Sequence, residues 1–184
     1  MIYKPREDSE LLAKYVKKYA FGLVLDIGTG SGVLALEAAK KKDVKKVIAT
    51  DIQKSVIEYC KENIKNKKVV FKQSDLFSNI KKIKFDTIIF NPPYLPEDIR
   101  LKDLTLDGGK KGYEVIERFL NKVDGYLKPN GIILIVFSSL TKPKIINSII
   151  KKNKLKCILL EKKRIFFEEL FVYLIKCQKF STSL

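Results

Sequence analysis

The tetrapeptide Asn91-Pro92-Pro93-Tyr94 is the part of the sequence whose residue types most directly suggest chemistry. It follows the apolar run 85–90, and because proline has no N–H to donate, the Pro-Pro pair ends that predicted strand. Asn91 is therefore expected at the carboxyl edge of a sheet, where ligands bind in open α/β folds. Its amide, the carbonyls left free by the prolines and the tyrosine ring would form a polar clamp for a planar group that carries an NH2. A structural turn capped by asparagine is the alternative interpretation of the tetrapeptide alone.

A glycine-rich segment, Gly28-Thr29-Gly30-Ser31-Gly32, lies between an apolar run at 23–27 and a helical pattern. Glycines let a ligand approach the backbone, and the first N–H groups of a helix can bind an anion. A dinucleotide-binding fingerprint would have glycine or alanine where this chain has Val33. The G-x-G-x-G form, with Asp26 two residues before Gly28, fits S-adenosylmethionine better, because that ligand carries a carboxylate and no pyrophosphate.

Two acidic residues follow the next predicted strands. Asp51, about 20 residues past the glycines, is placed to accept hydrogen bonds from both hydroxyls of a ribose. A carboxylate that only caps the helix at 55–64 is the alternative. Asp75 would accept the amino group of adenine, with Leu76 and Phe77 packed on the ring, although an ordinary surface turn is nearly as good an explanation.

Strand-like and helix-like patterns alternate along the chain, which predicts βαβ units and a mostly parallel sheet. Strands are expected at 23–27, 47–50, 69–71, 84–90 and 132–137, and helices at 9–19, from 33 onward, and at 55–64, 113–126 and 144–151. Two further runs, 155–160 and 170–177, predict a terminal hairpin that adds an antiparallel strand near one edge. The long polar segment 94–112 predicts a lid or a substrate rim.

The length of 184 residues predicts one domain, and 46% hydrophobic with 32% charged residues is typical of a soluble globular protein. The longest apolar run, 131–137, is far shorter than the roughly 20 residues that cross a bilayer. Residues 1–5 do not begin a signal peptide, since no apolar stretch follows them. We therefore expect a cytoplasmic protein without membrane contact.

The sequence contains no histidine, which excludes a histidine base, a histidine-bound zinc and a Ser-His-Asp triad. Cys60, Cys157 and Cys177 are far apart and lie among apolar residues, so they are expected to be reduced core thiols rather than metal ligands. No metal site is predicted.

The formal net charge of +16 would attract nucleic acid or a ribonucleoprotein. The lysines, however, are spread along every segment and often lie at predicted helix ends, where they suit the helix dipole. A lysine-rich genome would produce the same composition. Nucleic acid is therefore a possible partner, but a less favoured one.

Taken together, the sequence resembles the class I S-adenosylmethionine-dependent methyltransferases, and more narrowly the HemK-type protein glutamine methyltransferases of the short eukaryotic and archaeal kind. Four motifs carry the resemblance in the right order: Tyr3-Lys4-Pro5-Arg6-Glu7-Asp8-Ser9, the segment 26–32, Asp51 and Asn91-Pro92-Pro93-Tyr94. Asp107-Gly108-Gly109, with Gly112 after it, agrees as well. Asn-Pro-Pro-Tyr alone is shared with adenine and guanine N-methyltransferases, so the Pro-x-Glu-Asp-Ser opening is what points to the glutamine group.

The resemblance implies a Rossmann-like α/β fold, with helices on both faces of a seven-stranded sheet in the order 3-2-1-4-5-7-6 and strand 7 antiparallel. The residues that it implies for cofactor binding are Ser9, Asp26, Gly28, Gly30, Asp51, Asp75, Leu76 and Asn91. The residues that it implies for the acceptor amide and its methylation are Asn91, Pro92, Pro93 and Tyr94.

The acceptor that the resemblance implies is the glutamine of the Gly-Gly-Gln loop of a peptide-chain release factor, which becomes N5-methylglutamine. Bacterial members carry an additional N-terminal helical domain that recognises the factor, and this chain is expected to lack it. Short members work with a small zinc-binding activator protein at the exposed third strand. Val69 and Phe71 on that edge are expected to supply an apolar interface.

Three other functions compete with this one. A nucleic-acid amino methyltransferase would use the same clamp on adenine or guanine, but no segment is left for a separate target-recognition domain. A non-catalytic cofactor-binding protein would not need the full set of motifs. A nicotinamide dehydrogenase is disfavoured by Val33.

Overall fold

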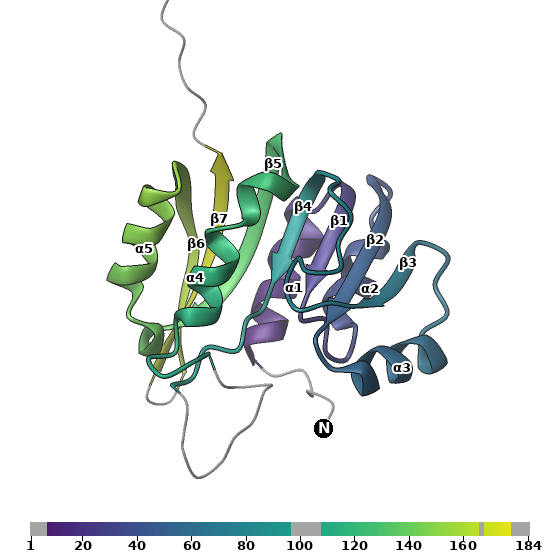
Figure 1. Cartoon of the computed structure of the whole chain (residues 1–184), viewed down its shortest axis with the longest axis horizontal. Helices are drawn as coiled ribbons and strands as arrows, with labels where there is room; N and C mark the ends of the chain where they lie inside the picture. Colours follow the sequence, from purple (N-terminus) through teal and green to yellow (C-terminus); the bar gives the residue numbers. More distant parts are fainter. Residues whose placement is uncertain (1–6, 97–107, 166–167, 178–184) are drawn as a thin grey trace, which may run out of the picture.

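The computed structural model describes residues 7–96, 108–165 and 168–177. Its centre is a seven-stranded sheet in the order β3-β2-β1-β4-β5-β7-β6, in which β7 runs antiparallel to both of its neighbours (Figure 1). The strands are β1 (Gly22–Ile27), β2 (Val44–Asp51), β3 (Val69–Gln73), β4 (Phe85–Phe90), β5 (Leu127–Ser138), β6 (Leu155–Ile165) and β7 (Glu168–Cys177). The predicted fold class and strand order are confirmed.

Helices cover both faces of the sheet (Figure 1). They are α1 (Glu7–Tyr19), α2 (Val33–Ala39), α3 (Lys54–Asn63), α4 (Glu114–Leu120) and α5 (Pro143–Lys152), with short 3-10 helices η1 (Val123–Tyr126) and η2 (Ser139–Thr141). Helix α1 shows why these segments are helical, since its first turn is acidic and its last turn basic, and its apolar residues recur on one side.

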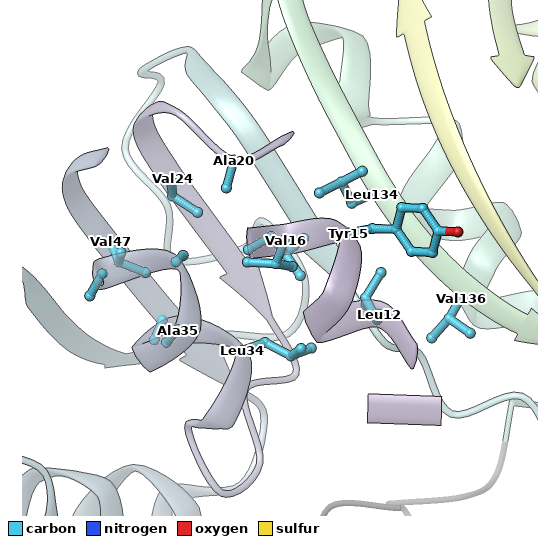
Figure 2. Packing of buried hydrophobic residues seen from close by; sticks show 14 of the residues in the cluster. Leu12, Tyr15, Val16, Ala20, Val24, Leu34, Ala35, Val47, Leu134 and Val136 are labelled. Carbon is cyan, nitrogen blue, oxygen red and sulfur yellow. The ribbon is translucent and has the colours of Figure 1, made fainter. Parts of the chain in front are cut away.

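Two buried clusters lie on opposite faces of the sheet. One receives the apolar sides of α1, α2 and α3, and the other receives α4 and α5. Figure 2 shows the first cluster, where Leu12 and Val16 of α1 lie beside Leu134 and Val136 of β5. Because both faces are covered, β1 and β4 are almost continuously apolar, as expected of buried parallel strands.

The register of the central strands brings three chain segments together at one edge. Ile27, the last residue of β1, pairs with Thr50 of β2 on one side and with Phe90 of β4 on the other. All three strands are parallel and end at the same level. The segments that follow them, namely the glycine turn, Asp51 and Asn91, therefore emerge next to one another.

Three local predictions are corrected by the structure. The helix expected at 113–126 ends at Leu120 and continues as η1, and the fifth strand begins earlier, at Leu127, with a register shift against β4. Of the three thiols, only Cys60 is fully buried, whereas Cys157 is exposed and Cys177 is half-buried. The reason for Cys157 is that β6 is the edge strand, whose apolar residues are not covered on both faces.

The third strand is an open edge, but the residues expected to form its interface are not the exposed ones. Phe71 is only 8% exposed and belongs to the core, and Val69 packs against that core, whereas Val70 between them is 45% exposed. Successive side chains of a strand alternate between faces. The face of β3 that packs on the helices thus takes the two residues predicted for the interface, and Val70 lies on the open side.

No helix in the described ranges is long and apolar enough to span a membrane. No group of three or more cysteine, aspartate or glutamate side chains in that part of the chain is arranged to hold a metal ion.

Candidate active site

A cavity of about 760 Å³ opens at the carboxyl edge of the sheet. Its wall is built from the glycine turn, the ends of β2, β3 and β4, the first turn of α1, one side of α4 and the β6–β7 hairpin. Of the residues predicted for the site, those that line it are Ser9, Gly28, Gly30, Asp51, Asp75, Leu76, Asn91, Pro92, Pro93 and Tyr94. Segments that are far apart in the sequence thus form one site.

The glycine turn has a backbone conformation that residues other than glycine rarely adopt. Gly28 and Gly30 have φ angles of +66° and +51°, in the left-handed region that favours glycine. The turn is fastened to β2 by two hydrogen bonds, from the Thr29 N–H to the Thr50 carbonyl (2.8 Å) and from the Gly30 N–H to Asp51 Oδ2 (3.1 Å). The turn is therefore fixed in position before any ligand binds.

Asp26 lies beneath this turn and does not line the cavity. It is completely buried, its Oδ2 accepts a hydrogen bond from the Thr29 hydroxyl (2.7 Å), and its Oδ1 has no hydrogen-bond partner among the described residues. Burial raises the pKa of this carboxyl to about 7, and the neighbouring Asp51 adds to the shift. In this structure Asp26 supports the glycine turn, so its effect on a ligand would be indirect.

This buried carboxyl predicts a pH dependence of stability. Between its ordinary pKa of 3.8 and about 7, folded Asp26 keeps a proton that the unfolded chain releases. The free energy of unfolding should therefore fall as pH rises through that window, by on the order of 4 kcal/mol from this group. Urea denaturation of the wild type and of Asp26→Asn across this pH window gives the free energy of unfolding of each. The difference between the two should shrink towards low pH, and two parallel plots of this free energy against pH would contradict the prediction.

Asp51 is placed for both of the roles that the sequence left open. Its Oδ1 accepts the N–H of Gln53, the residue before α3, at 2.9 Å, and its Oδ2 accepts the N–H of Gly30. The side chain also lines the cavity, where burial raises its pKa. Each carboxylate oxygen can accept a second hydrogen bond. Capping and ligand binding are therefore compatible in this residue.

The turn after β3 places Asp75 and Leu76 on the wall of the cavity. The Ser74 N–H donates to the Asp51 carbonyl (2.9 Å), and the Ser74 hydroxyl donates to the Leu76 carbonyl (2.9 Å). Leu76 has a φ of +49°, a costly conformation that these bonds help to maintain. Strain of this kind is typical of residues that a binding site holds in place.

Phe77 does not take the place predicted for it beside an adenine ring. Its ring is buried and stacked on Tyr126 (4.3 Å between centroids) and Phe119 (5.6 Å). The left-handed residue before it reverses the chain, which turns Phe77 into the core beneath α4. Leu76 alone of the pair lines the cavity.

The clamp at Asn91 is supported by the first turn of α1. Asn91 Nδ2 donates to the Ser9 hydroxyl (3.1 Å), and the Tyr94 hydroxyl donates to Asp8 Oδ2 (3.2 Å). Asn91 Oδ1 is buried and has no hydrogen-bond partner in the described part of the chain. The amide is thus held through its nitrogen, while its oxygen remains as an acceptor.

Other residues that line the cavity were not predicted for the site, among them Val115, Arg118, Ile165 and Glu168. Val115 and Arg118 lie three residues apart on α4, hence on one side of the helix. Ile165 and Glu168 pair at the end of the β6–β7 hairpin. No local motif marks these residues. For Val115 and Arg118, the three-residue spacing on a helix that follows the polar loop could have indicated that both face the site.

Comparison with known proteins places this site in a family. Residues 5–165 match the methyltransferase small domain family, and the chain belongs to it. It is 39% identical over 178 residues to the Methanocaldococcus jannaschii protein named "Putative protein N5-glutamine methyltransferase MJ0928", covering 93% of this chain and 89% of that one. The predicted recognition and the methyltransferase activity class are confirmed.

Other similar proteins are consistent with this family. A "Release factor glutamine methyltransferase" of Moorella thermoacetica is 30% identical over 155 residues. The match covers 73% of this chain but only 54% of the length of that protein. Among solved structures, a chain in the E. cuniculi Mtq2–Trm112 complex, described as responsible for methylation of the eRF1 translation termination factor, has a TM-score of 0.79. It is 24% identical, with 96% of this chain and 98% of that chain covered, and so supports the fold.

Proposed function

We propose that this methyltransferase uses S-adenosylmethionine to methylate the side-chain amide of a protein glutamine, in the Gly-Gly-Gln loop of a peptide-chain release factor. The observation that carries the proposal is the buried, unpartnered oxygen of Asn91. Asn91 lines a cavity whose wall also includes a carboxylate suited to ribose, that of Asp51. The relatives named for glutamine methylation support the same substrate.

The cavity lining fits the cofactor on several counts. Asp51 has acceptor capacity left for ribose hydroxyls, and Asp75 and Leu76 offer an acceptor and an apolar surface for adenine. The backbone of Gly28 and Gly30 faces the same space. When bound, S-adenosylmethionine supplies a methyl group activated by a positively charged sulfur, which a nitrogen lone pair can attack.

The clamp would act on the acceptor amide, which is a poor nucleophile because its lone pair is delocalised into the carbonyl. Asn91 Oδ1 and the Pro92 carbonyl would accept its two N–H bonds, which orients the nitrogen and raises its electron density. Positioning of this kind contributes on the order of 7–11 kcal/mol in well-oriented reactions. Tyr94 would pack against the amide plane. After methyl transfer the nitrogen would release one proton to water, so a strong base is not required, in agreement with a chain that contains no histidine.

We also propose that a small zinc-binding activator protein binds at the β3 edge. Val70, Ile52 and Tyr59 are large apolar residues that are exposed on or near that strand, and the Gln73 amide connects β3 to the Ile52 carbonyl. An unpaired strand edge with exposed apolar side chains favours pairing with another chain. The E. cuniculi chain of similar fold was solved as a complex with Trm112, which supports the presence of a partner protein.

Mass spectrometry tests the proposed function. The chain is incubated with S-adenosylmethionine and a release factor, with and without a candidate activator, and we expect one added methyl group on the Gly-Gly-Gln glutamine. A factor with that glutamine replaced by alanine should remain unmodified. Methylation of RNA or DNA in parallel reactions, with none on the factor, would instead establish a nucleic-acid methyltransferase.

A further inference from the structure

We propose that Arg118 is a positioning residue that sets the preference of this site for a 6-amino purine. It does so by fixing the carboxylate of Asp75. The inference rests on the proposed function, because it assumes that adenine lies against Asp75. It concerns a residue on α4 that the sequence motifs do not include.

The contact is direct and spans the cavity wall. Arg118 Nη2 lies 2.6 Å from Asp75 Oδ2, and both side chains line the cavity. The two residues come from the turn after β3 and from α4, 43 positions apart. Val115, one turn earlier on the same side of α4, also lines the cavity. The ion pair therefore joins two separate parts of the wall at one end of the site.

The pair is too exposed to be explained by stability. The side chains of Arg118 and Asp75 are 52% and 41% exposed, and exposed ion pairs contribute little to folding. Their position is more informative. The backbone of Asp75 is already fixed, because its N–H donates to the Ser78 hydroxyl (3.1 Å) and its carbonyl accepts the Ser78 N–H (3.0 Å). The Asp75 carboxylate can still rotate about its side-chain bonds, and the contact with Arg118 fixes its orientation.

The chemistry of the fixed carboxylate selects one purine. Arg118 occupies Oδ2, and no hydrogen bond from the described residues reaches Oδ1. A carboxylate oxygen held in this way can accept from the amino group at position 6 of adenine. It would repel the carbonyl oxygen that hypoxanthine carries there, because two acceptors would then face each other. Without Arg118 the carboxylate can rotate towards water, and this discrimination should weaken.

Calorimetric titration with S-adenosylhomocysteine and its 6-oxo analogue, S-inosylhomocysteine, tests the inference. For the wild type we expect the amino form to bind about 10- to 100-fold more tightly, the range for a hydrogen bond to a charged group. Arg118→Gln should lose most of this ratio, and Arg118→Lys should keep part of it. Lys122→Gln, which removes an exposed charge near the end of the same helix, serves as the matched control and should keep the full ratio.

A double variant separates positioning from a general charge effect. Asp75→Asn alone should abolish the preference, and Arg118→Gln should change the ratio no further in that background. An unchanged ratio in Arg118→Gln, with S-adenosylhomocysteine bound normally by the wild type, would overturn the role of Arg118 and leave the proposed function intact. Failure of the wild type to bind S-adenosylhomocysteine would overturn both.

Discussion

Replacing Asn91 by alanine is expected to reduce methyl transfer by about 10²- to 10³-fold, the usual cost of losing one preorganised hydrogen-bonding group around a reacting centre. The substitution removes the unpartnered Oδ1 and the donor to Ser9, but it leaves Asp51 and the glycine turn in place. Affinity for the cofactor should therefore change little. Single-turnover methylation of a release factor, with calorimetry for the cofactor, measures the two effects separately.

The control for this variant is Asn63→Ala, which removes an exposed asparagine whose side-chain amide, within the described residues, donates a hydrogen bond only to the Tyr59 carbonyl on its own helix. It should keep full turnover. Ser9→Ala is an intermediate case, because Asn91 would lose its support and keep its acceptor. Near-normal turnover by Asn91→Ala would show that the acceptor amide is held elsewhere, and the assignment of the clamp would have to be abandoned.

Asp51→Ala is expected to weaken cofactor binding by about 10²- to 10⁴-fold, since two charged hydrogen bonds to a ribose contribute roughly 1.5–3 kcal/mol each. The same change removes the acceptor for the Gln53 and Gly30 N–H groups. A loss of about 1 kcal/mol in the free energy of unfolding, as for other caps, should accompany it. Calorimetry and urea denaturation give the two quantities independently.

Asp43→Ala is the matched control, because Asp43 immediately precedes β2 while Asp51 ends it. Asp43 is exposed at the opposite edge of the sheet, where only its backbone carbonyl is used, by the Gly22 N–H. It should leave cofactor affinity unchanged. If Asp51→Ala lowered stability without affecting cofactor affinity, the residue would be a helix cap and no more.

Much of the fold could be predicted because its determinants are local. Apolar runs ended by Gly28, Asp51 and the Pro92-Pro93 pair mark the strands, and their alternation with helical patterns requires a parallel sheet. Element boundaries were less accurate. The helix predicted at 113–126 ends at Leu120 because the following residues form η1, whose Val123 packs into the core.

Site residues were predictable where a motif places them next to a strand end, and not where packing decides. Asp51 and Asn91 line the cavity as expected. Asp26 lies beneath it, because its register partners are Ala49 and Ile89, two residues before Asp51 and Asn91, and it is completely buried there. Phe77 and the Val69–Phe71 pair show the same effect. These residue types are suited to contact a ligand or a partner. In the structure, however, their side chains point towards the core and pack there.

The amino-acid sequence by itself determined the alternation of strands and helices, the position of the glycine turn and the residues that follow the strand ends. These follow from periodicity and from the backbone limits of glycine and proline, which act over a few residues. The order of the strands in the sheet was implied only by the resemblance to a known family. Only the tertiary structure decided that α4 brings Arg118 to Asp75, that α1 supports Asn91 through Ser9 and that Val70 is the exposed residue of β3. Such contacts depend on how helices pack across the sheet, and residues distant in sequence carry no local signal of it.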